Sequence, residues 1–198
     1  MDADRRRRLT PEERRSQLVA LGVGFLVDRP LDELTIEELA EQAGISRALV
    51  FHYFGSKQGL HREVVTTAAA AMLAASAPRD DLAPRERLRD TLGRIVAFVR
   101  DHRGTFFSLV RGVASGDAVV RTAVDAARDE HAERVTRVFL DLGAADTVLL
   151  RVTLRAWIAL AEEVLIELAL GTDRAAEEIV ALLERTAQGV VDAAADSS

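Results

Sequence analysis

The side chains best suited to bind an anion lie in a 21-residue window that contains no acid, between Glu41 and Glu63. Its basic side chains are Arg47, His52, Lys57, His61 and Arg62. Guanidinium and ammonium groups bind phosphate, and the guanidinium fork also matches the edge of guanine. Residues 1–62 are balanced, with ten basic and ten acidic residues, and the whole chain carries a net charge of −6. The window therefore predicts a local positive surface suited to a polyanion such as DNA.

Two short helices must position these side chains. Thr35-Ile36-Glu37-Glu38 has the pattern of a capping box and opens the first helix, which Gly44 ends, and Ser46 can cap a second helix to about Tyr53. Ala40 falls where two crossed helices leave room only for a small side chain. The apolar positions expected at that crossing are Leu39, Ala43, Ile45 and Val50. The spacing is typical of a helix-turn-helix.

Three classes of protein are compatible with a Gly-linked helix pair. The charge window favours a DNA-binding protein over an all-helical adaptor that uses its C-terminal part to bind another protein. An enzyme is disfavoured because the chain has no Cys, four His, no His-Glu-x-x-His, no Gly-x-Ser-x-Gly and no phosphate-binding loop. We therefore expect no catalytic residue, no metal site and no cofactor.

The sequence resembles the tetracycline-repressor (TetR) family of one-component transcriptional regulators. The likeness runs from Thr35-Ile36-Glu37-Glu38-Leu39-Ala40 through Ala43-Gly44-Ile45-Ser46 to Phe54-Gly55-Ser56-Lys57-Gln58-Gly59-Leu60. It implies an all-α fold, with a three-helix DNA-binding domain over residues 1–62 and a helical ligand-binding and dimerisation domain over residues 63–198. By resemblance, Thr35 and Lys57 bind phosphates and the helix from Ser46 to Tyr53 enters the major groove of double-stranded DNA.

The chemistry of the second short helix agrees with that role. Arg47 has the length and geometry to read guanine or to grip phosphate, Ala48 and Leu49 suit thymine methyl groups, and His52 and Tyr53 suit a base edge or the backbone. The candidate DNA-binding residues are Thr35, Ser46, Arg47, Ala48, Leu49, Phe51, His52, Tyr53 and Lys57.

Two positions depart from the family pattern. Phe51 stands where the family usually has a Tyr whose hydroxyl binds phosphate, so that contact is either lost or supplied by Tyr53 or His52. Pro30 stands where the family often has Gly, which leaves the shape of that loop open. The basic run Arg5–Arg8 is either an arm that tracks DNA or a solvated terminus.

Longer helices are expected on either side of this unit. Thr10-Pro11-Glu12-Glu13 is a capping box that opens a helix to about Val27. The expected later ranges are 57–76, 84–102, 104–114, 117–140, 146–170 and 172–194. The last helix carries an apolar stripe, formed by Ala176, Ile179, Val180, Leu183, Ala187, Val190, Val191 and Ala194. That stripe suits packing along a partner helix, and the resemblance implies a homodimer through the last two helices.

The resemblance also implies that the C-terminal part binds a small molecule. Five of the nine aromatic residues lie in its middle helices, where such side chains could line a pocket. The candidate ligand-binding residues are Phe98, His102, Phe106, Phe107, His131 and Trp157. The resulting hypothesis is a repressor that a small apolar ligand releases from a palindromic operator. An activator with the same DNA-binding domain and a helical adaptor remain the alternatives.

No segment predicts a membrane span. The longest uncharged run after the first helix, residues 64–78, has 15 residues, whereas a span needs about 20 apolar ones. The basic N-terminus resembles the start of a signal peptide, but acids are interspersed there and Val27-Asp28-Arg29-Pro30 is no cleavage site. We therefore expect a cytoplasmic protein.

Overall fold

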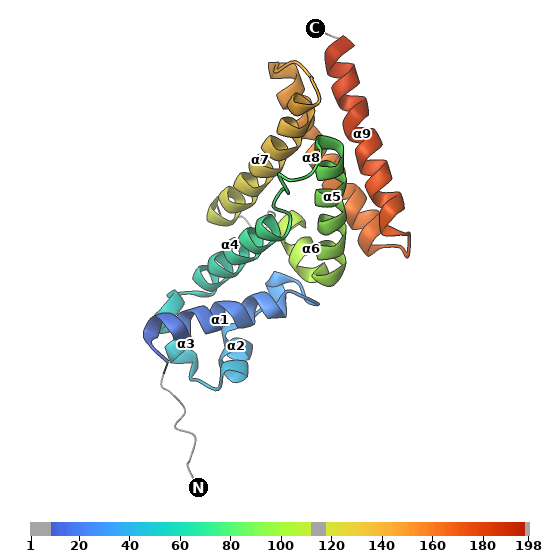
Figure 1. The fold of residues 1–198 in the computed structure, drawn as a ribbon. Helices are drawn as coiled ribbons and strands as arrows, with labels where there is room; N and C mark the ends of the chain where they lie inside the picture. Colours follow the sequence, from blue (N-terminus) through green and yellow to red (C-terminus); the bar gives the residue numbers. More distant parts are fainter. Residues whose placement is uncertain (1–8, 112–117, 197–198) are drawn as a thin grey trace.

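The computed structural model describes residues 9–111 and 118–196, which form helices and no strand (Figure 1). The first four helices are α1 Pro11–Phe25, α2 Ile36–Ala43, α3 Arg47–Phe54 and α4 Lys57–Ala75. The others are α5 Pro84–Asp101, α6 Arg103–Arg111, α7 Ala118–Asp141, α8 Val148–Val164 and α9 Ala176–Asp196. In Figure 1, α1, α2 and α3 lie together at one end, and α4 leads from them to the larger bundle. The all-α prediction is confirmed. Within the described ranges, no helix is long and apolar enough to cross a membrane.

The helix starts follow the predicted capping residues. The Thr10 hydroxyl accepts a hydrogen bond from the Glu13 amide (3.1 Å), and the Glu13 carboxylate accepts one from the Thr10 amide (2.8 Å). At α2, the Thr35 hydroxyl accepts from the Glu38 amide (3.2 Å), whereas the Glu38 carboxylate accepts from Arg29. Only the Thr35 half of that second capping box is therefore made as predicted.

Several helix ends differ from the predicted ones. α1 ends at Phe25 rather than Val27, because the Val27 amide bonds the Gly24 carbonyl, three residues back instead of the four of an α-helix. The helix expected over 146–170 changes to π-helical turns at Leu165–Leu170. α9 starts at Ala176 instead of residue 172, since the Thr172 hydroxyl donates to the Leu168 carbonyl (2.7 Å) and thus belongs to the preceding turn. The expected ends near residues 114 and 117 lie outside the described residues.

A first apolar core joins α1–α4 and includes Leu109 of α6 and Val124 of α7. Gly22 allows α1 to approach α4 closely, because a Cβ at this position would lie 2.5 Å from Val64 Cγ2. The domain boundary predicted at residues 62 and 63 falls inside α4, whose buried side chains on both sides of it belong to this core.

A second core fills the bundle of α5, α7, α8 and α9 and receives Phe106 from α6. The apolar stripe of α9 faces this core, with Ile179, Leu183 and Ala187 fully buried. α9 packs along α8 and α5 of its own chain. The helices that this stripe packs along are therefore α8 and α5 of the same chain.

Candidate functional site

Two glycines and a serine set the place of α3 on the first core. Gly44 ends α2 and Gly55 ends α3, both in the left-handed conformation (φ 64° and 70°) that a residue without Cβ adopts at low cost. The Ser46 hydroxyl caps α3 by accepting a hydrogen bond from the Leu49 amide (3.2 Å). Val50 and Phe54 are buried and hold the inner face of α3 against the core.

The opposite face of α3 presents most of the predicted DNA-binding residues to solvent. Ser46, Arg47, Ala48 and His52 are exposed, and the Phe51 ring is 45% exposed. Leu49 and Tyr53 are half-buried. The Tyr53 ring packs against the core and contacts the rings of His52 and Phe54. Of the two residues proposed to replace the missing phosphate-binding hydroxyl, His52 is thus the more exposed.

Thr35 and Lys57 lie at the starts of α2 and α4, and both are half-buried. The Lys57 ammonium donates a hydrogen bond to the Asp32 carbonyl (3.0 Å), so it is held beside the turn that leads into α2. That turn is the 3-10 segment Leu31–Glu33, which follows Pro30. The sequence left the shape of this loop undetermined. In the structure it is a short helical turn to which Lys57 donates a hydrogen bond. Arg5–Arg8 lie outside the described residues.

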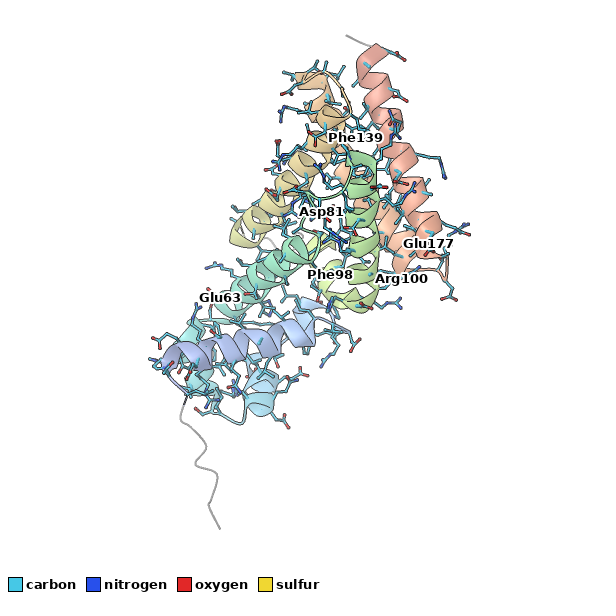
Figure 2. All side chains as sticks on the ribbon, in the orientation of Figure 1. Glu63, Asp81, Phe98, Arg100, Phe139 and Glu177 are labelled. Carbon is cyan, nitrogen blue, oxygen red and sulfur yellow. The ribbon has the colours of Figure 1, made fainter. Side chains whose placement is uncertain are left out.

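Acidic side chains from outside the acid-free window of the sequence lie close to this surface in the folded protein. Glu37 of α2 forms an ion pair with Arg47, and both side chains are more than half exposed. Glu63 of α4 binds Arg15 of α1 (2.8 Å), at the side of α4 that faces α1 in Figure 2. The His61 ring is within hydrogen-bond distance of the Leu34 carbonyl (3.0 Å), and its partial burial lowers its pKa. The exposed cations Arg47 and Arg62 and the half-buried Lys57 therefore supply the positive charge.

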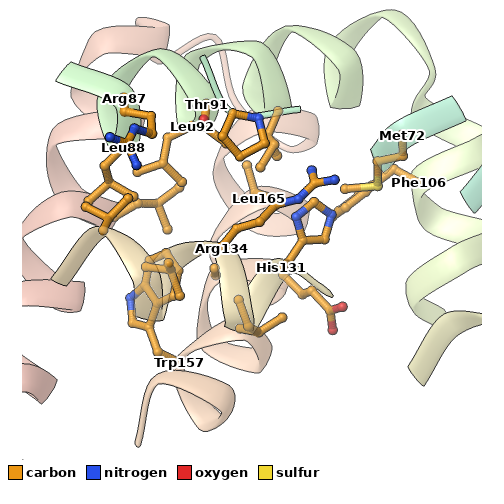
Figure 3. A pocket seen from close by; sticks show the side chains of 18 residues that line it. Met72, Arg87, Leu88, Thr91, Leu92, Phe106, His131, Arg134, Trp157 and Leu165 are labelled. Atoms are coloured by element: carbon orange, nitrogen blue, oxygen red, sulfur yellow. The ribbon is translucent and has the colours of Figure 1, made fainter. Parts of the chain in front are cut away.

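A cavity with about 80 Å³ of free volume lies in the second core, between α5, α7 and α8 (Figure 3). Three of the six candidate ligand-binding residues line it, namely Phe106, His131 and Trp157. The other three are not among its lining residues. Phe98 and His102 contact each other at the end of α5 (ring centroids 4.5 Å apart), and the Phe107 ring is 44% exposed. Only half of the candidate set is therefore brought together.

Sequence reasoning missed most of the lining. α5 contributes Arg87, Leu88, Thr91, Leu92 and Ile95, and α7 contributes Arg134, Val135 and Val138 besides His131. The available signal was the helical spacing of these positions, because residues three and four apart share one face of a helix. A search by aromatic residue type alone could not find them.

Most polar side chains at the cavity already have hydrogen-bond partners within the protein. The Trp157 indole N–H donates to the Thr186 hydroxyl (3.0 Å), and Glu162 accepts a bidentate bond from Arg128 (2.8 to 3.2 Å). Burial, together with the nearby Arg134, lowers the pKa of His131 to about 4. His131 is therefore neutral at pH 7. No cluster of three metal-ligating side chains occurs among the residues that the structure describes.

α6 connects the cavity to the helix-turn-helix. Its Phe106 lines the cavity, while the neighbouring Thr105 hydroxyl donates to the Leu26 carbonyl (3.1 Å) just after α1. One turn further on, the Ser108 hydroxyl accepts from the Leu31 amide (3.0 Å). Thr105 and Ser108 are both buried, so these bonds are shielded from water. α6 therefore links the lining of the cavity to the loop before α2 by direct hydrogen bonds.

An apolar face of α8 is left uncovered. Val148 is 81% exposed and Val152 58%, and exposed Ala156 and Leu160 follow at the same four-residue spacing. These four positions lie on one side of the helix. Exposed apolar faces of this kind mark protein–protein contacts.

A capped second helix with an exposed basic outer face, joined to a helical bundle with an internal cavity, is the architecture of a helix-turn-helix transcriptional regulator. Comparison with known proteins bears this out. Residues 19–64 match the family model for bacterial regulatory proteins of the tetR family, and residues 84–189 match the tetracyclin repressor-like C-terminal domain. The chain belongs to the TetR family of DNA-binding transcriptional regulators.

Individual relatives agree with this assignment. A tetR-family transcriptional regulator from Streptomyces coelicolor is 27% identical with a TM-score of 0.82, covering 96% of this chain and 85% of that one. A TetR-like regulator from Rhodococcus sp. RHA1 is 26% identical with a TM-score of 0.72, covering 91% and 97%. The regulator BetI of Agrobacterium fabrum is 42% identical over 57 residues, which are 25% of this chain and 28% of BetI. The matches to curated relatives thus span less than half of those proteins.

Proposed function

We propose that this TetR-family regulator is a repressor that binds a palindromic operator as a homodimer and leaves it when a small apolar ligand fills the cavity. The observation that carries the DNA-binding part is the outer face of α3, where Arg47, Ala48 and His52 are exposed while Val50 holds the helix on the core. Binding to chromosomal DNA makes the cytoplasm its place of action.

In this proposal α3 lies in the major groove. Arg47 reads guanine through its guanidinium fork, and Ala48 and Leu49 contact thymine methyl groups. Lys57 and the start of α2 at Thr35 bind backbone phosphates, because a helix N-terminus offers free amides and Lys57 adds a point charge beside it. His52 supplies the polar contact that Phe51 cannot make.

The dimer is proposed to form through α8 and α9. The uncovered face of α8, with Val148, Val152 and Leu160, supports this interface because these side chains gain burial only from a second molecule. A two-fold dimer presents its two α3 helices to successive major grooves, which is the reason to expect a palindromic operator.

Ligand release is proposed to run through α6. A ligand that fills the cavity displaces Phe106, and the bonds of Thr105 and Ser108 transmit this displacement to the loop before α2. The ligand then favours a state in which the two α3 helices no longer match the operator spacing.

Fluorescence anisotropy on DNA from beside the gene tests the DNA-binding part. We expect saturable binding that weakens steeply with salt. Arg47→Ala lowers affinity for the operator by about 1–3 kcal/mol and relaxes the preference at one base pair, whereas Lys57→Ala weakens all sequences about equally and lowers the salt slope by about 1.

Titrations with operators mutated at single base pairs separate the two roles. A uniform loss for Arg47→Ala at every sequence would remove it as a base-reading residue. Flat titrations of the unmodified protein at low salt would contradict the repressor proposal as a whole and favour the adaptor.

A further inference from the structure

The cavity of the second core contains an unusual pair of polar atoms. Among the described residues, two buried side-chain nitrogens have no hydrogen-bond partner, His131 Nε2 and Arg87 Nε, and both residues line this cavity. Buried polar atoms are nearly always paired, so an orphaned atom at a cavity points to a ligand that supplies the partner. Figure 3 shows the side chains of Arg87 and His131 well apart from each other in the site. Arg87 bonds Asp141, which lies ten residues after His131 on α7 and therefore about 15 Å from it along the helix. The two unpartnered nitrogens are thus too far apart for one small ligand, and the following argument concerns His131.

The charged groups of the cavity already have counter-charges. Arg87 bonds Asp141 (2.9 Å), Arg134 bonds Glu130 (2.8 Å), and Glu162 is held by Arg128. A charged ligand would therefore lose its hydration without gaining an uncompensated partner, which is costly in an apolar site. The remaining lining is mostly aliphatic and aromatic, which favours a neutral and largely apolar ligand.

His131 determines which polar group such a ligand carries. Its ring is neutral at pH 7, and Nε2 is then either a donor or an acceptor, depending on the tautomer. A hydroxyl group both donates and accepts, so it satisfies Nε2 in either tautomer. A carboxylate accepts only, and it also brings the charge that this site disfavours.

We propose that the cavity binds a neutral, mostly apolar molecule with a hydroxyl group that hydrogen-bonds His131 Nε2. This inference rests on the ligand-relieved function proposed above and names the chemical class of the ligand. The present free volume of about 80 Å³ is smaller than a cavity that holds benzene, about 150 Å³. A one-ring ligand therefore requires the lining to shift, and the flexible Met72 side chain is suited to that.

Three probes of matched shape test the class, because p-cresol, p-xylene and p-toluate differ only in one ring substituent. Binding to the whole 198-residue chain is measured by titration calorimetry at pH 7.5. We expect p-cresol to bind about threefold to tenfold more tightly than p-xylene and p-toluate to bind most weakly. We also expect only p-cresol to shift the ¹⁵N resonance of His131 Nε2. This shift reports the hydrogen bond in the unmodified protein, so it does not depend on a variant that folds.

Substitutions locate the effect. His131→Leu abolishes the advantage of p-cresol over p-xylene, and His131→Gln, which keeps a hydrogen-bonding group, restores part of it. His102→Leu is the matched control, since His102 contacts Phe98 and is not among the lining residues, and it leaves the advantage unchanged.

Three results overturn the proposal: equal binding of p-cresol and p-xylene, tightest binding of p-toluate, or no binding of any probe. Operator affinity is measured on the same preparations without probe. Intact operator binding with no probe binding rejects the ligand class alone, whereas loss of operator binding rejects the proposed function.

Discussion

The ion pair between Arg47 and Glu37 governs how the candidate base-reading guanidinium is presented. Glu37 lies in the first turn of α2, ten residues before Arg47, and thus outside the acid-free window of the sequence. Both side chains are exposed, and such pairs contribute only about 0–1 kcal/mol to stability. Glu37 therefore costs little to remove, while its charge opposes the approach of DNA phosphates.

Replacing Glu37 with Gln is expected to raise DNA affinity. The change removes one negative charge from the surface beside α3 and frees Arg47, so we expect about a fivefold tighter complex in low-salt anisotropy titrations, fading as salt increases. Glu41→Gln is the matched control, because Glu41 is an exposed acid on the same helix. An equal gain for both variants would show that net charge alone, and not the pair with Arg47, is responsible.

The half-buried His131 makes stability depend on pH. Its pKa is about 4 in the folded protein and about 6.5 when exposed, because burial and the Arg134 charge disfavour its protonated form more than Glu130 favours it. Below pH 6.5 the unfolded chain binds a proton that the folded one does not, so the free energy of unfolding falls as pH decreases from about 6.5 to 4. The full loss is up to about 3 kcal/mol.

His131→Leu is expected to remove this part of the acid sensitivity. Urea unfolding of the wild type and the variant, measured in steps between pH 7 and 4, should show that the wild type loses up to about 3 kcal/mol more unfolding free energy than the variant as the pH falls. The carboxylates titrate in both proteins and cancel in the difference. Curves that stay parallel over this range would contradict the burial of a neutral His131.

The helices around α3 were predictable because their limits depend on local interactions. Thr10, Ser46 and Gly44 each act within four residues along the chain, so sequence alone identifies the capped starts and the left-handed turn. The direction of an apolar side chain depends on packing far along the chain. Phe106 is buried in the cavity lining and its neighbour Phe107 is 44% exposed, a difference that residue type cannot reveal.

Two glycines of α1 provide a matched test of how α1 packs on α4. Gly22→Ala places a Cβ 2.5 Å from Val64 Cγ2, so we expect a loss of about 1–3 kcal/mol. Gly24 is exposed with nothing within 4 Å of such a Cβ, so Gly24→Ala should raise stability by about 0.5–1 kcal/mol. Both values come from urea unfolding. Stabilisation by both substitutions would mean that α1 and α4 pack less closely than the structure has them.

At the scale of the whole molecule, α6 and α8 make long-range contacts that the sequence did not reveal. Ser108 bonds Leu31, 77 residues away, and this bond joins the cavity region to the loop before α2. The periodicity of α9 correctly predicted one buried face but not its partner, which is α8 and α5 of the same chain. The proposed dimer surface includes the exposed face of α8 around Val152, and its sequence signal is weaker because Arg151 and Arg155 directly precede the apolar residues Val152 and Ala156.

Val152→Asp is expected to separate the dimer. In a two-fold interface each substitution appears twice, so two buried carboxylates would face the apolar side of the partner helix. Val152 is 58% exposed in the single chain, and its replacement should change the stability of the monomer by about 0.5 kcal/mol or less. Sedimentation should therefore show a folded monomer. Its operator affinity should be reduced at least about 100-fold, because the monomer holds only one half-site at a time. Ala97→Asp adds the same charge at an exposed position of α5 and should leave the dimer intact. A Val152→Asp protein that still sediments as a dimer would exclude this face of α8 from the interface.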